Sequence, residues 1–446
     1  MALFALTVAR NPARDFQGDA IRYWRGAQTG WAFLFGDAPA TGGASTSALT
    51  TDTPVIQHAA LGLRGVLAFV VYAPAALADR LAAGSGAAAV LVENALIIAV
   101  LGAVVLPAIA RTLGVRGPAT ICWCAAGVWL LVAPFAPYPL MDVPAAAVFL
   151  CAVLLASAGS RRCLVAAGLC AGIALNLRPA YLVPLAAVVV VIAAVRRLRG
   201  LWLLPGVAVA LVPQFAVNAV GGFGWFPVPP LSGSLANFQA GLSSYIVRYD
   251  TLLAGPPQQF YCDPHMAHAF LGRAVTSVAD LPFTMLTNLP WSAVFLLEKF
   301  SAALAWSPHV PYSVPPADES YSLLLPVAAI TVCGTSALIA AALRRGSAGR
   351  RPEAALVAAA MLGACVTLLA SAAETRFALP VVLLGIVGSA LALASIRRSR
   401  TVRPVWAVAV AAGTLVVVVS ATAGLSHPLP PLPVGALEIH DCAAPG

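Results

Sequence analysis

Residues 404–424, PVWAVAVAAGTLVVVVSATAG, carry no charged side chain. A helix rises about 1.5 Å per residue, so this run alone spans about 30 Å, the thickness of the hydrocarbon core of a bilayer. Other apolar runs lie at 62–82, 86–110, 118–135, 143–159, 163–177, 180–195, 201–220, 321–343, 354–373 and 377–396. The sequence therefore predicts an all-α integral membrane protein, a polytopic bundle of about 10–12 transmembrane helices.

The composition supports this fold class. Of the 446 residues, 60% are hydrophobic and 10% are charged, with a mean hydropathy of +0.89, whereas soluble domains carry roughly 25% charged residues. The net charge of +9 comes from arginines in short loops, since Lys299 is the only lysine. Arginines in such loops report membrane topology, so membrane lipid is the expected partner and nucleic acid is not.

The arginine clusters set the expected topology. Clusters at 161–162, 196–199, 344–351 and 397–403 all lie in the cytoplasm if 163–195 is a helical hairpin that turns outside at Arg178-Pro179. The loop at 374–377 then lies outside. If 62–82 crossed the membrane, Asp19 would be cytoplasmic, so we expect this run, which contains Pro74, to be re-entrant or interfacial. The expected location is the cytoplasmic membrane, with the functional face outside.

Five regions follow from this topology. We expect a truncated first span and first external loop at 1–60, an N-terminal transmembrane bundle at 61–220, and an external loop with amphipathic, membrane-hugging helices at 221–320. C-terminal transmembrane helices follow at 321–424, and a short external tail at 425–446.

The segment 18–27, GDAIRYWRGA, is a charged and aromatic island in a mostly apolar chain. In a helix, Asp19, Tyr23 and Ala27 are four residues apart and share a face. Asp19 could then act as a general base beside a substrate contact from Tyr23. The alternatives are a solvated loop aspartate without a role, or the same role taken by Asp15.

Two further polar residues lie at expected external helix ends. Asp142, in YPLMDVP, either serves the site or caps the following helix, whose first turn suits Pro144. Arg178, in NLRPAY, either binds a phosphate through its planar guanidinium or only extends from a helix end towards the interface.

Glu374-Thr375-Arg376-Phe377 interrupts two strongly apolar runs. Charged groups at membrane depth are costly and usually face a cavity or a partner. Either Glu374 and Arg376 form a local structural pair, or Arg376 binds an anionic headgroup while Glu374 orients it. His265 and His268 have helical metal-ligand spacing but no clear third ligand, so no metal site is predicted.

Taken in order, these elements resemble the GT-C class of polytopic glycosyltransferases, in particular bacterial relatives of the protein mannosyltransferases and the lipid A aminoarabinose transferases. The resemblance rests on Asp19 with Tyr23, the PLMDVP segment at 139–144, the LRP turn at 177–179, and ETRF at 374–377. The segment 298–300 also resembles the region before the last spans of such enzymes.

The resemblance implies a GT-C-like fold and transfer of a sugar from a polyprenyl-phosphate donor to a glycan, lipid or protein acceptor at the outer membrane face. Asp19 maps onto the family's catalytic aspartate, with Asp142 as a second catalytic candidate. Tyr23, Arg178, Glu374 and Arg376 are the expected substrate-binding residues. No cofactor is fixed, and a divalent cation stays open because some relatives use one.

Two other classes of function compete with this one. A transporter or flippase for a lipid-linked anionic substrate would use the same arginines for binding without reaction. A non-catalytic membrane scaffold would use 221–320 as a partner surface and would have no ordered cavity joining Asp19, Arg178 and Arg376.

Overall fold

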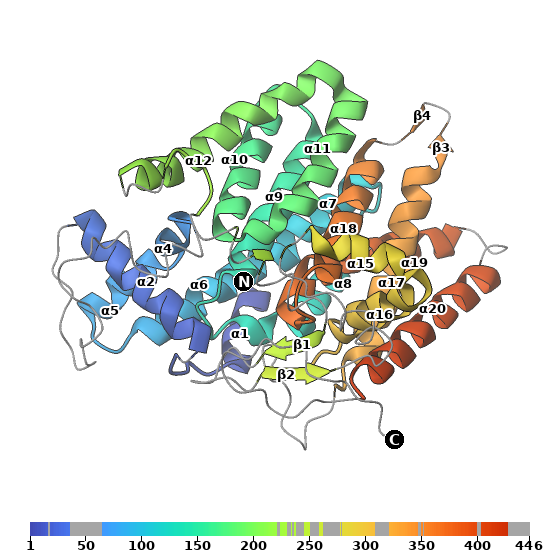
Figure 1. The fold of residues 1–446 in the computed structure, drawn as a ribbon, viewed down its shortest axis with the longest axis horizontal. Coiled ribbons are helices and arrows are strands. Elements are labelled where there is room, and N and C mark those ends of the chain that lie inside the picture. Colours follow the sequence, from blue (N-terminus) through green and yellow to red (C-terminus); the bar gives the residue numbers. More distant parts are fainter. Residues whose placement is uncertain are drawn as a thin grey trace.

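The structure is a computed structural model, and it is helical apart from two short pairs of antiparallel strands (Figure 1). It describes residues 1–16, 18–35, 65–220, 224–229, 233, 236–237, 245–249, 258–261, 277, 279–307, 321–346, 349–350, 352–398 and 403–426.

The N-terminal half contains the first helices and two short 3₁₀ turns, with one π-helical turn, η2, inside a long helix. The elements are α1 (Ala2–Arg10), α2 (Gly18–Phe35), α4 (Leu67–Val71), α5 (Ala73–Leu81), α6 (Gly86–Val100), η2 (Leu101–Val105), α7 (Leu106–Thr112), α8 (Pro118–Leu131), η3 (Ala133–Phe135), α9 (Asp142–Ala158), α10 (Arg161–Leu177), η4 (Pro179–Tyr181) and α11 (Leu182–Arg196).

The C-terminal half continues with longer helices. The elements are η5 (Arg197–Trp202), α12 (Leu203–Val220), β1 (Ile246–Tyr249), β2 (Gln258–Tyr261), α15 (Asp280–Thr287), α16 (Leu289–Ala302), α17 (Leu324–Leu343), β3 (Arg345–Gly346), β4 (Gly349–Arg350), α18 (Pro352–Leu369), η6 (Thr375–Ala378), α19 (Leu379–Arg398) and α20 (Arg403–Gly424). Strand β1 pairs with β2, and β3 pairs with β4.

Six helical segments within the described residues are long and apolar enough to cross a membrane: Gly86–Thr112, Pro179–Val220, Leu324–Leu343, Pro352–Leu369, Thr375–Ile396 and Pro404–Gly424. Two shorter apolar helices are Pro118–Leu131 and Asp142–Ala158. Large apolar side chains such as Val190, Val209 and Val405 are exposed on the outside of the bundle, as expected where lipid replaces water. The prediction of a helical, multi-pass membrane protein is confirmed.

Helix α19 lies at the centre of the bundle. In its most apolar stretch 78% of the residues are buried, against 17% for α20 at the periphery. It packs closely on α17, where a Cβ at Gly334 would overlap the backbone of Gly385, and one at Gly388 would overlap the backbone of Gly334. Small residues at such a crossing allow helix backbones in a membrane to approach each other.

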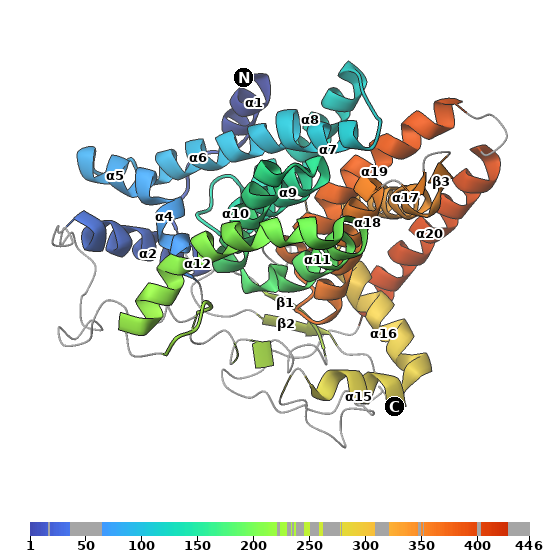
Figure 2. The same ribbon diagram turned by 90° about the horizontal axis from the view of Figure 1, so that it is seen from above.

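Helix α2 lies beside α4 and α5, away from the long C-terminal helices (Figure 2). Its buried face is formed by Ala20, Trp24 and Ala27. Gly26 and Gly30 leave the space that the ring of Phe69 on α4 occupies. This packing holds the N-terminal turn of α2, which carries Asp19.

The run 62–82 was expected to be re-entrant or interfacial. Within the part that the structure describes, it forms two short helices, α4 and α5, which meet at Tyr72. Its position relative to a bilayer stays a prediction. The other expected runs agree with the observed helices to within a few residues, and the hairpin 163–195 turns at Arg178 as expected.

A buried hydrogen-bond network fixes the loop that leads to Asp142. The hydroxyl of Tyr72 lies 2.8 Å from the carbonyl oxygen of Leu140 and 3.1 Å from Oδ1 of Asn94, so these two acceptors share its one hydrogen. The amide of Asn94 on α6 donates to the carbonyls of Ala136 and Tyr138 at 3.0 and 2.9 Å. Backbone groups without water need such partners, so Asn94 holds the loop against α6.

A second network holds the start of α4. The backbone N–H of Leu67 donates to Oδ1 of Asn176, and that of Val66 to Oε1 of Gln214, both at 2.8 Å. Gln214 in turn donates to Asn218 at 2.9 Å, inside the apolar helix α12. These buried amides connect α4 to α10 and α12, on the same side of the bundle as the end of α10.

We expect Asn94→Ala to lower the stability of the folded protein by about 2 kcal/mol, because it removes the amide donor from the buried carbonyls of Ala136 and Tyr138. Thermal unfolding of the purified protein in detergent measures this change. Leu96→Ala is the control, since Leu96 lies on the same helix but is exposed. Equal destabilisation by the two substitutions would contradict the role of the network.

Candidate functional site

The site forms where four segments distant in sequence meet. Turn η6, between α18 and α19, contributes Arg376, and Glu374 directly precedes this turn. Helix α2 contributes Asp19, the first turn of α9 contributes Asp142, and Arg178 follows the end of α10. The structure brings all four polar segments together, as contacts between their side chains show.

Arg376 is held between two carboxylates. Its Nε donates to Oε2 of Glu374 at 2.5 Å, and its Nη2 lies 3.5 Å from Oε1 of the same residue. Its Nη1 donates to Oδ2 of Asp19 at 3.1 Å. The side chains of Arg376 and Glu374 are 8% and 4% exposed, whereas that of Asp19 is 31% exposed. Asp19 is therefore the accessible member of this group.

Arg178 forms an ion pair with Asp142, and both side chains are buried. The N-cap position of α9 is Met141, without a side-chain capping bond, so the interpretation of Asp142 as the helix cap is wrong. Burial beside a carboxylate also excludes the interpretation of Arg178 as a side chain that extends from a helix end towards the interface. A guanidinium out of water needs such a partner, and Asp142 supplies it.

The ring of Phe377 joins the two ionic groups. The guanidinium carbon of Arg178 lies 4.2 Å from the centre of this ring, and that of Arg376 lies 5.1 Å from it. Both separations are within the range of cation–π contact. Phe377 therefore lies beside both arginines, a role that the sequence interpretation did not assign to it.

The ionic cluster consists of three carboxylates and two guanidiniums, so acidic groups are in excess: Asp19, Asp142, Glu374, Arg178 and Arg376. Burial raises the pKa of Glu374, and the facing guanidinium of Arg376 opposes this effect. Asp19 has a second cationic neighbour, Nη1 of Arg22 at 3.9 Å, whose side chain is 76% exposed. The carboxylate in excess is thus the one nearest the surface.

Tyr23 lies on α2 one turn after Asp19, is partly buried, and is close enough to Arg376 for an electrostatic interaction. The expectation that Asp19, Tyr23 and Ala27 lie on one helix is confirmed, and Ala27 is fully buried. Asp15, the alternative acid, is exposed in the segment before α2.

No group of three His, Cys, Asp or Glu side chains that could hold a metal ion occurs in the described residues. His265 and His268 lie outside them.

In α16, Lys299 is fully buried, with its Nζ 5.9 Å from the centre of the Phe295 ring, and burial lowers its pKa to about 7.

Sequence interpretation missed Glu93, which lies on α6 next to Asn94. One of its carboxylate oxygens, Oε2, is buried without a hydrogen-bond partner among the described residues. The signal was present in the sequence, since a carboxylate inside an apolar run is a reason to expect a role. Glu93 lies close enough to Tyr72 for an electrostatic interaction.

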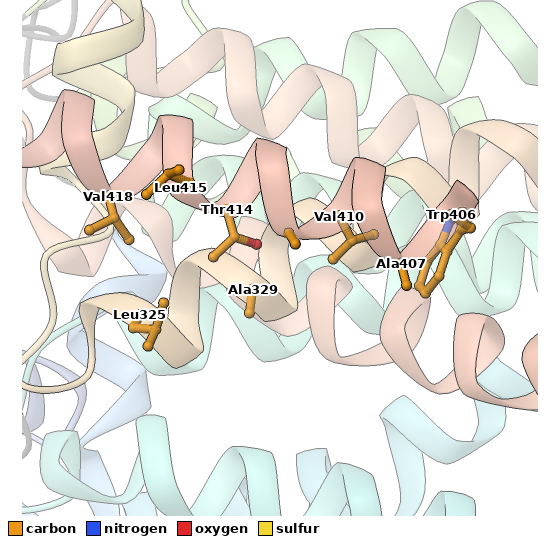
Figure 3. A pocket seen from close by; sticks show the side chains of 9 residues that line it. Leu325, Ala329, Trp406, Ala407, Val410, Thr414, Leu415 and Val418 are labelled. Atoms are coloured by element: carbon orange, nitrogen blue, oxygen red, sulfur yellow. The ribbon is translucent and has the colours of Figure 1, made fainter. Parts of the chain in front are cut away.

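An apolar groove between α17 and α20 is separate from this cluster (Figure 3). It is lined by Leu325, Ala329, Trp406, Ala407, Val410, Ala411, Thr414, Leu415 and Val418. None of the ionic residues contributes to its lining, and Thr414 supplies its one side-chain hydroxyl. The groove therefore does not extend the candidate site.

No protein-family model matches the chain, and neither the curated proteins nor the solved structures that were compared with it give a match.

We expect Asp142→Leu to destabilise the protein by about 3 kcal/mol or more, because it removes the carboxylate that pairs with the buried guanidinium of Arg178. Adding Arg178→Met should recover most of that loss, since the pair is then replaced by apolar side chains. Unfolding midpoints of the wild type, both single variants and the double variant measure the coupling. Additive effects in the double variant would contradict a direct pair.

Proposed function

We propose that the protein is a GT-C-like membrane glycosyltransferase that moves a sugar from a polyprenyl-phosphate donor to an acceptor hydroxyl at the outer face of the cytoplasmic membrane. The observation that carries the proposal is the ionic cluster: an accessible carboxylate, Asp19, in contact with the buried guanidinium of Arg376, within a helical membrane protein. A base beside a cation suits a reaction in which an alcohol loses a proton and a phosphate leaves.

In the proposed reaction, the acceptor oxygen attacks the anomeric carbon of the sugar. A new carbon–oxygen bond forms there, while the bond between the anomeric carbon and the donor phosphate breaks. Asp19 accepts the proton of the attacking hydroxyl, as a general base. The electron pair of the broken bond stays on the phosphate, whose charge Arg376 stabilises.

The remaining residues have supporting roles in this proposal. Glu374 holds the Nε and Nη2 edge of Arg376, which fixes the direction of Nη1. Arg178 is buried, its charge is offset by Asp142, and its guanidinium supports the ring of Phe377 beside Arg376. Asp142 therefore serves as a positioning residue, and Tyr23 as a substrate contact on the exposed side.

The transporter hypothesis shares this binding site and differs only in the need for a base. A carrier of lipid-linked anions would use the guanidinium of Arg376 in the same way, and Asp19 would only balance its charge. The two proposals therefore make opposite predictions for a substitution that keeps the shape of Asp19 and removes its basicity.

We expect Asp19→Asn to reduce sugar transfer by about 100-fold or more, the usual contribution of a general base. The measurement is transfer of radiolabelled sugar from a panel of polyprenyl-phosphate donors, in membranes with matched expression of each variant. Asp15→Asn, which removes an exposed charge nearby, should keep transfer close to the wild-type rate.

Equal transfer by the wild type and Asp19→Asn would exclude Asp19 as the base. Absence of transfer from every donor in wild-type membranes, together with uptake of a lipid-linked anion, would favour the transporter. The proposed GT-C-like arrangement of about 10–12 spans places Asp19 outside the cell. We therefore expect a cysteine introduced in place of the exposed Arg25 to react with a membrane-impermeant thiol reagent in intact cells.

A further inference from the structure

The guanidinium of Arg376 has two unlike sides. Its Nε and Nη2 edge faces Glu374, whose carboxylate is buried, with Nε and Oε2 2.5 Å apart. Its remaining nitrogen, Nη1, faces Asp19. Because Asp19 is the more exposed partner, its carboxylate lies between Nη1 and the accessible side of the cluster. A ligand that reaches Arg376 from this side meets Asp19 first.

Asp19 is also the carboxylate that Arg376 needs least. Glu374 alone balances the single positive charge of this guanidinium, so Asp19 adds a negative charge in excess. Asp19 has another partner within reach, since its Oδ1 already lies 3.9 Å from Nη1 of Arg22, one turn along α2. A change of side-chain rotamer lets the carboxylate exchange one arginine for the other at small cost.

We propose that Nη1 of Arg376 is the binding position for the phosphate of the lipid donor, that Asp19 occupies this position in the free protein, and that donor binding moves Asp19 to Arg22. This inference rests on the proposed function of the same site. Asp19 is thus an internal competitor of the donor until the donor arrives, and the base of the reaction afterwards.

The chemistry of the groups favours the exchange. A phosphate presents several acceptor oxygens, so one of them can replace the single carboxylate oxygen of Asp19 at Nη1 in a charge-assisted hydrogen bond. Arg14 and Arg25 are exposed around the start of α2, and such positive charge attracts an anionic headgroup. The base becomes available only when the donor is bound, so donor binding should precede acceptor binding.

The test measures binding without turnover. The full chain, in nanodiscs of zwitterionic phosphatidylcholine, is titrated with decaprenyl phosphate, which carries the phosphate but no sugar. We expect Asp19→Asn to bind decaprenyl phosphate about tenfold more tightly than the wild type, because the competing charge is gone. Asp15→Asn is the matched control, and it should bind like the wild type.

The substitution Arg22→Gln distinguishes the exchange of Asp19 between two arginines from a direct contact of Arg22 with the phosphate. Because Asp19 then loses its second partner, it should stay on Arg376, and binding should weaken about threefold or more. In the Asp19→Asn background, the same Arg22→Gln substitution should have no effect. Arg22 is exposed, so this cycle does not depend on a substitution in the core. Arg376→Gln should abolish the gain that Asp19→Asn produces.

Two further ligands, inorganic phosphate and decaprenol, identify which part of decaprenyl phosphate the binding position recognises. If Asp19→Asn improves binding of decaprenyl phosphate alone, the position recognises a lipid-borne phosphate. If it improves binding of inorganic phosphate equally, the position recognises phosphate from either source, and both results support the proposal. An equal gain with decaprenol, which lacks the phosphate, overturns it.

Three other results overturn the proposal: equal affinity of the wild type and Asp19→Asn, an equal gain in Asp15→Asn, or a loss with Arg22→Gln that persists in the Asp19→Asn background. The proposed function fails separately. If the wild type transfers no sugar, but Asp19→Asn binds the phosphate more tightly than the wild type does, Asp19 is still an internal competitor of phosphate. The proposal of a glycosyltransferase is then contradicted.

Discussion

A buried guanidinium needs a carboxylate beside it, and this requirement governs the arrangement of the protein. Arg376 lies in the turn before the central helix α19, and it is 8% exposed. Glu374 supplies one partner from the same turn, and Asp19 supplies another from the far end of the sequence. The contact between Asp19 and Arg376 thereby relates α2 to α19, and a displacement of either helix would break it.

The same constraint applies to the backbone. The hydrocarbon core of a bilayer offers no water to unpaired backbone groups, so buried breaks between helices need partners within the protein. Asn94 supplies them for the loop before α9, and Asn176 and Gln214 supply them for the start of α4. These amides occur inside apolar helices, and each ends in hydrogen bonds to an irregular segment. One of these irregular segments, 136–140, leads to Asp142, and Asn176 itself precedes Arg178 by two residues, so both networks adjoin the ionic cluster in sequence.

The sequence predicted the helices well because each is encoded locally. Apolar runs bounded by arginine, glycine or proline gave most of the helix limits to within a few residues, including the hairpin that turns at Arg178. Part of the site was also predictable, since Asp19, Asp142, Arg178, Glu374 and Arg376 are charged groups at the ends of apolar helices. Their gathering is observed, while their roles in a reaction stay a proposal.

The pairings could not be predicted in the same way. Nothing near Asp142 indicates whether its carboxylate caps α9 or faces a guanidinium, and that depends on how α10 packs beside α9. The place of Phe377 between two arginines is likewise a tertiary property. Asn94 and Glu93 were missed for a different reason: they interrupt a run whose overall hydropathy dominates any window average. The two short strand pairs were missed because their segments are too brief to show a period.

The pair of Asp142 and Arg178 also bears on how the chain enters the membrane. Asp142 begins α9 and Arg178 follows α10, so the two charges lie at the same end of a helical hairpin whose connection is only Gly159-Ser160. Helices inserted one at a time would each carry an unpaired charge through the hydrocarbon, at several kcal/mol apiece. Inserted together, they carry a neutral pair. Biogenesis of this region therefore has an energetic reason to proceed by hairpins, with the cluster partly assembled before the later helices are synthesised.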